Sequence, residues 1–158
     1  MIIKPPTPLL GLTKPTIFLA GSIEMGVAEE WQTKVGNAIE SPSFITLNPR
    51  RDYWDASWKQ DINNPQFKEQ VTWEMDGLMG ASLRIFYFDP STKSPITLME
   101  LGLTCCLQTN LVCCREPFWR KGNVDILCQR YNIKQVSNIG HLIFETIDWQ
   151  HKYLKNHC

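Results

Sequence analysis

The segment LRIFYFDPSTKSPITLMELGL, at positions 83–103, decides the fold class. The run LRIFYF is almost entirely apolar, which is typical of a strand covered on both faces of a parallel sheet. A polar stretch follows, and Ser94–Pro95 has the residue types preferred at the cap and the first position of a helix. Beyond Pro95 the apolar residues recur at helical spacing. The segment is therefore predicted to be a strand, a loop and a helix.

The same order of elements recurs on both sides of this segment. Short apolar runs at 16–20, 44–47 and 111–114, and a weaker run at 134–137, predict further strands. The expected helices follow at about 27–39, 67–78, from 95, at 123–131 and at 140–154. Five strand–helix units imply a doubly wound, flavodoxin-like or Rossmann-like parallel sheet of five strands with helices on both faces. In such a sheet ligands bind beyond the carboxyl ends of the strands.

Length and composition restrict the class of protein. The chain has 158 residues, 43% of them hydrophobic, which suits a single domain at 16–158 after an N-terminal extension at 1–15. Its 16 basic and 16 acidic residues give a formal net charge of +0, which argues against nucleic-acid binding through a broad basic field. No apolar run approaches the roughly 20 residues needed to span a bilayer, and the proline-rich start is no secretion signal. We expect a cytoplasmic protein that binds neither nucleic acid nor membrane.

The 6 cysteines do not have the spacing of a metal site. Adjacent pairs at 105–106 and 113–114 fit the C-x₂-C spacing of zinc sites poorly. Reduced thiols that pack as small hydrophobic side chains are the preferred interpretation, and metal binding is the alternative. We expect no metal and no cofactor.

Glu100 is predicted to lie within the apolar stripe of the helix that starts at Pro95. It follows Ile96 by four residues and precedes Leu103 by three, so this stripe is expected to direct it at the sheet. A carboxylate there is costly unless it is paired or lines a ligand cavity. Glu100 is therefore either a nucleophile or acid/base group at the sheet edge, or a structural glutamate with a local hydrogen bond.

The preceding helix carries two more carboxylates. Glu74 lies beside the predicted apolar face, three residues after Val71 and four before Leu78, whereas Asp76 is turned away from it. Glu74 is therefore the expected partner of Glu100. Two carboxylates at one cleft can cleave a glycosidic bond, because one attacks the anomeric carbon and the other handles the proton of the leaving group. A structural role for Glu74 is the alternative.

The segment 48–65 has no clear periodicity, and loops of this length are often functional. It carries Asp52 and three aromatic residues, Tyr53, Trp54 and Trp58, whose flat faces suit a planar ring. These aromatic residues either contact a substrate or anchor the loop to the body of the protein.

Three motifs resemble the nucleoside 2-deoxyribosyltransferases. They are FLAGSI at 18–23, WEMDGLMGAS at 73–82 and SPITLMELGL at 94–103, and the similarity covers about 16–114. The resemblance implies purine and pyrimidine (deoxy)nucleosides and free bases as substrates, and a homo-oligomer. It further implies that Glu100 attacks C1′ and forms a covalent glycosyl-enzyme, which a second base resolves with net retention.

Several positions differ from the family pattern. Glu74 matches the family's aspartate that handles the proton of the base, and Phe18 matches a tyrosine that touches the nucleophile. Ser94 stands where transferases of free nucleosides often have an aspartate for the 5′-hydroxyl, and it resembles relatives that hydrolyse deoxynucleoside 5′-monophosphates. Glu24 near the mouth of the site repels a phosphate dianion, so nucleosides are preferred. Asn132 loosely matches an asparagine that reaches across from a neighbouring subunit.

The resemblance thus implies base exchange between nucleosides. The expected substrate-binding residues are Phe18, Gly21, Ser22, Asp52, Tyr53, Asp76, Ser94 and Asn132. The alternatives are a hydrolase of the N-glycosidic bond in (deoxy)nucleosides or their 5′-monophosphates, and a non-catalytic nucleoside or nucleotide sensor. We expect the helix N-terminus to keep Glu100 ionised, and an apolar neighbourhood with a second carboxylate to raise the pKa of Glu74.

Overall fold

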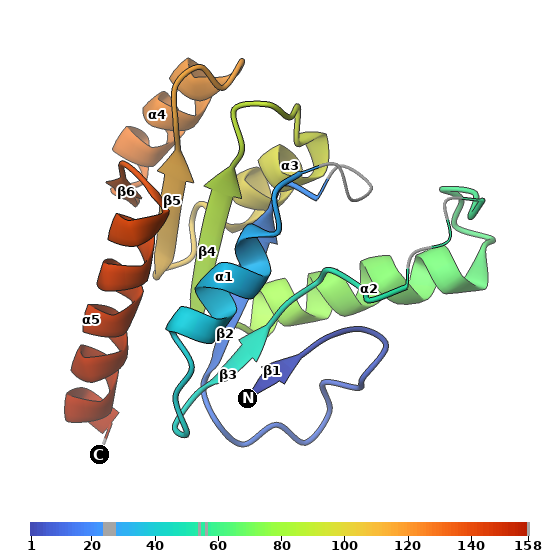
Figure 1. Cartoon of the computed structure of the whole chain (residues 1–158), viewed down its shortest axis with the longest axis horizontal. Coiled ribbons are helices and arrows are strands. Elements are labelled where there is room, and N and C mark those ends of the chain that lie inside the picture. The colour runs from blue at the N-terminus through green and yellow to red at the C-terminus, as the bar shows by residue number, and fades with distance from the viewer. Residues whose placement is uncertain (24–27, 54, 56, 158) are drawn as a thin grey trace.

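The structure is a computed structural model that describes residues 1–23, 28–53, 55 and 57–157 (Figure 1). Within these residues the chain forms a parallel sheet of six strands, in the order β1-β3-β2-β4-β5-β6, with five helices. The strands are β1 (Ile2–Ile3), β2 (Thr16–Gly21), β3 (Ile45–Leu47), β4 (Leu83–Phe88), β5 (Asn110–Cys114) and β6 (Lys134–Val136). The helices are α1 (Trp31–Ala38), α2 (Pro65–Gly80), α3 (Pro95–Thr104), α4 (Lys121–Arg130) and α5 (Ile139–His157).

The prediction of a parallel α/β sheet is confirmed, but the number of strands is wrong. Ile2 and Ile3 pair with Thr46 and Leu47 of β3, so the stretch expected to be an extension adds a sixth strand at the sheet edge. This strand is too short to show a period, and a proline-rich stretch follows it directly. Without β1, the order of the remaining strands agrees with a flavodoxin-like winding.

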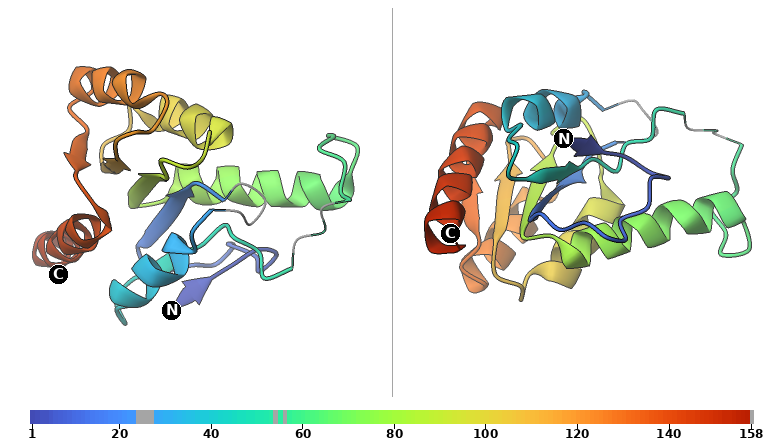
Figure 2. Two further views of the ribbon diagram at one scale, coloured as in Figure 1. Left: turned by 45° about the horizontal axis from the view of Figure 1, so that its top comes forward. Right: turned by 90° about the horizontal axis from the view of Figure 1, so that it is seen from below.

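Helices cover both faces of the sheet. In Figure 2 (left), α2, α3 and α4 lie on one side of the strands, and α1 and α5 lie on the other. On β4, Phe86 and Phe88 belong to the core under α2, α3 and α4, whereas Ile85 and Tyr87 belong to the core under α1 and α5. Burial on both faces explains why this strand is apolar at nearly every position.

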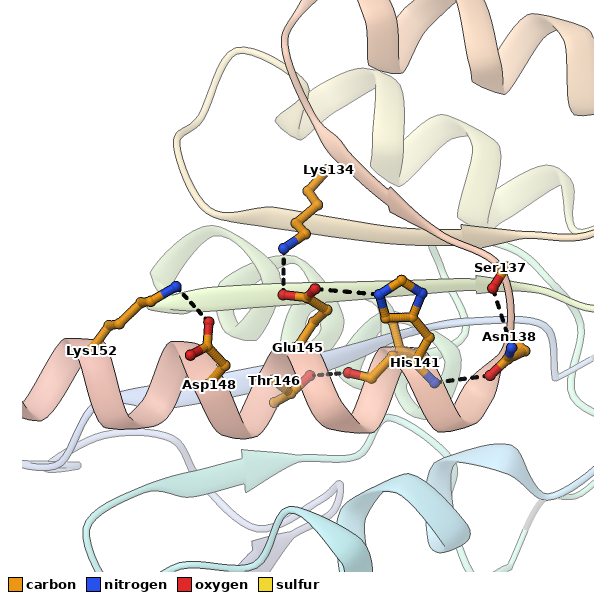
Figure 3. Close-up of polar contacts among 9 residues, drawn as sticks. Lys134, Ser137, Asn138, His141, Glu145, Thr146, Asp148 and Lys152 are labelled. Carbon is orange, nitrogen blue, oxygen red and sulfur yellow. Dashed lines mark hydrogen bonds and ion pairs between the residues drawn. The ribbon is translucent and has the colours of Figure 1, made fainter.

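Side-chain caps mark the starts of α2 and α5, and ion pairs lie along α5. The side chain of Asn64 accepts hydrogen bonds from the backbone N–H groups of Gln66 and Phe67, so α2 begins earlier than the periodicity predicts. The side chain of Asn138 accepts from the N–H of His141 at the start of α5, over 2.9 Å. On the outer side of α5, Lys134 of β6 pairs with Glu145, and Lys152 pairs with Asp148 over 2.5 Å (Figure 3).

The apolar stripe of α3 does not face the sheet as predicted, and the stripe of α2 does so only in part, with Leu78 in the core. Ile96, Met99 and Leu103 are 51–62% exposed, and the buried residues of α3 are Thr97, Leu101 and Thr104. On α2, Met75 is likewise exposed. The stripe that was expected to face the sheet is therefore the exposed side of α3, and Glu100 lies at the border between the buried and exposed sides of its helix.

The cysteines that the structure describes are free thiols, and all but Cys106 are buried. Burial raises the pKa of Cys113 to about 11 and that of Cys114 and Cys128 to about 12. These thiols therefore stay protonated and pack as small apolar groups. Among the described residues no cluster of three histidine, cysteine or acidic side chains is placed to hold a metal ion. No helix in the described parts of the chain is long and apolar enough to cross a membrane.

Candidate active site

The candidate site begins at the carboxyl end of β2, where Gly21 allows close packing. A Cβ atom at Gly21 would lie 2.5 Å from the indole of Trp31 and 2.6 Å from the carbonyl oxygen of Tyr87. Only glycine fits between these two groups. The indole N–H of Trp31 also donates to the carbonyl oxygen of Ser22 over 3.2 Å. Gly21 and Trp31 therefore fix the position of Ser22 at the sheet edge.

Three buried hydroxyl groups meet at the ends of β2 and β4. The Oγ atom of Ser22 lies 2.8 Å from Oγ1 of Thr92 and 2.5 Å from Oγ of Ser94, and these last two atoms are 2.7 Å apart. The backbone N–H of Asp89 donates to Ser22 Oγ over 3.0 Å. We call Ser22, Thr92 and Ser94 the hydroxyl cluster. Since each hydroxyl can donate and accept, the cluster suits a sugar hydroxyl or a phosphate.

Ser94 joins this cluster because of its backbone conformation. It occupies the N-cap position of α3, as predicted, but with a left-handed backbone (φ 46°, ψ 51°) and no capping bond from its side chain. Its hydroxyl bonds to Ser22 and Thr92 instead. Thr92 was not among the predicted site residues. Its position in the loop after β4 could have indicated it, because this loop begins at the carboxyl end of a strand, where ligands bind in such sheets.

Glu100 and Glu74 lie close enough to influence one another's charge. Both are partly exposed, Glu74 in α2 and Glu100 in the second turn of α3. Loss of hydration raises the pKa of Glu100 to about 8, and the negative charge of Glu74 contributes to the increase. The expectation that the helix N-terminus keeps Glu100 ionised is not met, because desolvation favours the neutral carboxyl group. The neighbouring carboxylate acts in the same direction.

Glu74 has polar neighbours that Glu100 lacks among the described residues. Desolvation raises the pKa of Glu74, as expected from the sequence, but a hydrogen bond from Gln70 and the charge of Arg51 oppose the increase. Gln70 Nε2 donates to Glu74 Oε1 over 2.7 Å. Sequence reasoning did not identify Gln70, although its position four residues before Glu74 on one helix was a usable signal.

The other predicted substrate-binding residues lie in different surroundings. Phe18 is fully buried and packs against Trp73, with ring centroids 6.3 Å apart. Asp52 is exposed and pairs with Lys4 over 2.5 Å, Tyr53 is 90% exposed, and Asp76 faces solvent on α2. Their roles in binding stay predictions. Glu24 and Trp54 lie outside the described residues.

Asn132 lies at the amino-terminal ends of the strands, opposite the end at which the hydroxyl cluster lies. It follows α4 and immediately precedes β6, so it is found at the amino ends of the strands. There it lines a cavity of about 160 Å³ together with Cys105, Cys106 and Tyr131. Within one chain the structure does not bring Asn132 to the carboxylates.

A larger cavity, of about 610 Å³, opens at the carboxyl ends of β5 and β6. Its lining includes Arg115, Glu116, Gln135 and an ion pair between Lys121 and Asp125, with N and O atoms 2.6 Å apart. It contains none of the predicted site residues. It nevertheless lies at the same edge of the sheet as the hydroxyl cluster.

Comparisons with known proteins found a matching family and a similar solved structure. The model of the family described as nucleoside 2-deoxyribosyltransferase like matches residues 14–118, more than half of the chain. The matched region contains the hydroxyl cluster and both carboxylates. No curated protein matches the sequence. A crystal structure of a conserved protein from Enterococcus faecalis V583 is similar, with a TM-score of 0.60 and 13% sequence identity. The likeness covers 87% of this chain and 99% of that one, and at this identity it shows the fold alone.

Proposed function

Because the chain belongs to the nucleoside 2-deoxyribosyltransferase-like family, we propose that it moves a (2-deoxy)ribosyl group between nucleobases through a covalent intermediate on Glu100. The observation that carries this proposal is the electrostatically coupled pair of carboxyl groups on α2 and α3. One carboxylate attacks the anomeric carbon and the other supplies a proton to the departing base.

The pair holds a proton that the reaction requires. The pKa of Glu100 is about 8 and that of Glu74 is also raised, so the free protein retains a proton at neutral pH. Gln70 and Arg51 favour negative charge on Glu74, and this proton therefore rests on Glu100. Transfer of this proton to Glu74 produces an ionised nucleophile and a neutral acid.

The chemical steps then follow from this arrangement. The Glu100 carboxylate forms a bond to C1′ while the C1′–N bond breaks, and the proton on Glu74 passes to the nitrogen of the leaving base. A second base attacks C1′ and releases Glu100, and its proton returns to Glu74. Two displacements at C1′ give net retention of configuration.

The hydroxyl cluster is proposed to hold the 5′ end of the sugar. Ser94 lies at the start of α3, the helix that carries Glu100, so a sugar held there would direct its ring toward the carboxylates. Purine and pyrimidine (deoxy)nucleosides and free bases are the proposed substrates. We propose no cofactor, and a role in nucleoside salvage in the cytoplasm.

Hydrolysis of the N-glycosidic bond is the second candidate function. It is favoured by the uncharged hydroxyl cluster, which accommodates a 5′-phosphate better than an aspartate at position 94 would. In this reaction water replaces the second base, and the first half-reaction is unchanged. The third candidate, a non-catalytic sensor, would have no use for a carboxylate nucleophile.

A homo-oligomer is also proposed. The exposed side of α2 and α3 carries Met75, Met79, Ile96, Met99 and Leu103, each 47–62% exposed. Figure 1 shows the N-terminal part of α2 extending beyond the sheet. An apolar surface of this kind beside the carboxylates is typical of a subunit contact. A second copy would shield the site from water, which favours transfer over hydrolysis.

Incubation with deoxyinosine and either adenine or cytosine tests these functions. Transfer predicts a new nucleoside and, after quenching, a deoxyribosyl adduct on Glu100 in the mass spectrum. Release of hypoxanthine at the same rate with and without an acceptor base would identify a hydrolase, and the same assay with deoxyinosine 5′-monophosphate tests the phosphorylated substrate. Binding measured by calorimetry, without adduct or turnover, would identify a sensor and contradict the proposal.

A further inference from the structure

Gln70 is a buried polar residue whose side-chain amide has all of its hydrogen-bonding partners in place. It lies on α2, one turn before Glu74, and is 4% exposed. Its Nε2 donates to the carbonyl oxygen of Pro49 over 2.8 Å and to Oε1 of Glu74 over 2.7 Å. Its Oε1 accepts from Nε of Arg51. Both N–H groups of the amide are therefore used.

These neighbours permit only one orientation of the amide. The carbonyl of Pro49 can only accept a hydrogen bond, and the guanidinium of Arg51 can only donate. A flipped amide would place its oxygen against the Pro49 carbonyl and its N–H groups against Arg51. The orientation that satisfies both neighbours is the one that directs an N–H at Glu74.

Arg51 is itself held in place. Its Nη2 pairs with Oε2 of Glu69 over 2.6 Å, and its guanidinium lies 5.4 Å from the ring centroid of Trp58. The amide of Gln70 is therefore oriented by the long loop between β3 and α2 as well as by its own helix. Among the described residues, the charged groups that influence the carboxyl pair are Arg51, Glu74 and Glu100 themselves.

We propose that Gln70 is a positioning residue for the transfer reaction, because its amide makes Oε1 of Glu74 an obligatory acceptor and leaves Oε2 as the oxygen that carries the proton. This inference rests on the proposed function of Glu74. An oxygen that accepts an N–H hydrogen bond cannot also point a proton at the same donor. The neutral carboxyl group therefore has its C=O at Oε1 and its O–H at Oε2.

The position of this proton determines how Glu74 acts on the base. When the C1′–N bond breaks, the Oε2–H bond breaks as well, its proton joins the base nitrogen, and the electron pair stays on Glu74. The resulting carboxylate is stabilised at Oε1 by the N–H of Gln70 and by the charge of Arg51. When the second base attacks C1′, the proton on its attacking nitrogen passes to Oε2, and the neutral acid is restored.

The variant Gln70→Met tests this role, since methionine has a similar length and no hydrogen-bonding amide. Loss of the N–H bond destabilises ionised Glu74, so the acid limb of the rate–pH profile, at which Glu74 ionises, should move to higher pH by about one unit. The basic limb, at which Glu100 ionises beside an already charged Glu74, should keep its position. At the optimum, deoxyinosine should react about tenfold more slowly, and a nitrophenyl deoxyriboside, whose leaving group needs no proton, should be nearly unaffected. The matched control is Gln66→Met, one turn earlier on the exposed side of α2, and it should change neither the profile nor the rates.

A spectroscopic measurement separates this proposal from the proposed function. In infrared difference spectra between low and high pH, the C=O band of neutral Glu74, assigned by its loss in Glu74→Gln, should move to higher wavenumber in Gln70→Met. This band shift is expected even if the wild-type protein shows no base exchange. Absence of base exchange would contradict the proposed function but not the position of the proton on Glu74. An unchanged band together with an unshifted pH profile would overturn the role of Gln70.

The variant Gln70→Glu provides a second test if Gln70→Met does not fold. It preserves the size of the side chain and its contact with Arg51, but presents a charged acceptor to Glu74 and to the Pro49 carbonyl where the wild type presents donors. The pH profile should then move upward by more than one unit. An unshifted or downward profile would also contradict the proposal.

Discussion

The two carboxyl groups of the site are the same residue type in differently built regions. Around Glu74, on α2, a hydrogen bond from Gln70 and the charge of Arg51 oppose the effect of desolvation. Around Glu100, on α3, desolvation and the charge of Glu74 act in the same direction and bring its pKa to about 8. The polar partners therefore favour the ionised form of Glu74, whereas the surroundings of Glu100 favour its neutral form.

This difference shows how one residue type can fill two roles. The polar partners favour the negative charge on Glu74, although the proposed attack on C1′ requires it on Glu100. Substrate must therefore reverse the distribution before the bond to C1′ can form. A base nitrogen beside Glu74 would favour its protonated form, because that form can donate a hydrogen bond to the base. The pair is thus set to respond to the arrival of the base.

Removal of the nucleophile should have the largest effect. We expect Glu100→Gln to lower base exchange by at least about a thousandfold and to abolish the glycosyl adduct, because no other carboxylate of the site would replace its attack on C1′. The measurement is the formation of a new nucleoside from deoxyinosine and adenine. Glu40→Gln, an exposed substitution at the end of α1, is the control and should retain full activity. An adduct on another residue of the Glu100→Gln protein would refute the assignment.

Glu74→Gln should separate substrates by their leaving groups. Because Glu74 supplies the proton of the departing base, exchange of deoxyinosine should fall by about 10²–10⁴-fold. A nitrophenyl deoxyriboside should lose less than about tenfold, since its leaving group departs as an anion. Rates of free-base and nitrophenol release measure both effects. Equal losses for the two substrates would show that another residue handles the proton, with Asp76 or Asp52 as the next candidates.

The raised pKa of Glu100 has a consequence for stability. The ordinary pKa of a glutamate is 4.5 and that of folded Glu100 is about 8, so between these values the folded protein binds more protons than the unfolded chain. Its free energy of unfolding should therefore fall as pH rises from 4.5 to 8. Glu100→Gln removes this loss and should be more stable than wild type by about 1–3 kcal/mol at pH 8, with little difference at pH 4.5.

Denaturant unfolding of both proteins at pH 5 and pH 8 measures this difference. The Glu40→Gln protein controls for the general effect of pH. A stability difference between wild type and Glu100→Gln that does not grow with pH would show that the carboxyl group of Glu100 is well hydrated in the folded protein.

The sequence was sufficient for most of the fold. The runs at β2, β4 and β5 are buried on both faces, and such strands are apolar at nearly every position, so they can be read without a partner. β1 could not be predicted from the sequence, because its two residues form a strand only through pairing with β3. The exposed stripe of α3, which includes Ile96 and Met99, shows a second limit. Periodicity reveals an apolar side of a helix, but not whether its own sheet or another molecule covers that side.

The site was predictable in part. Placing Glu74 and Glu100 on neighbouring helices required only helical spacing and the order of the elements. The pKa of Glu100 was not predictable, because it depends on how strongly the fold desolvates its carboxyl group. The contact of Gln70 with Pro49 and Arg51 joins a helix to a loop without periodicity, which spacing along the chain cannot reveal. The position of Asn132 at the far edge also required the three-dimensional arrangement.

The smallest expected effect concerns the hydroxyl cluster at the start of the helix that carries Glu100. Ser94→Ala removes a hydroxyl from the Ser22–Thr92–Ser94 contacts, so kcat/KM for deoxyinosine should fall by about two- to tenfold, the value of one neutral hydrogen bond. The proton-handling role of Glu74 should be untouched, and the pH profile should keep its position. Ser91→Ala, which affects only an exposed serine bonded to Asp89 over 2.7 Å, is the matched control. If deoxyinosine 5′-monophosphate loses much more than deoxyinosine, the cluster recognises phosphate. If Ser94→Ala and Ser91→Ala behave alike for both substrates, the cluster serves the start of α3 and does not contact the sugar.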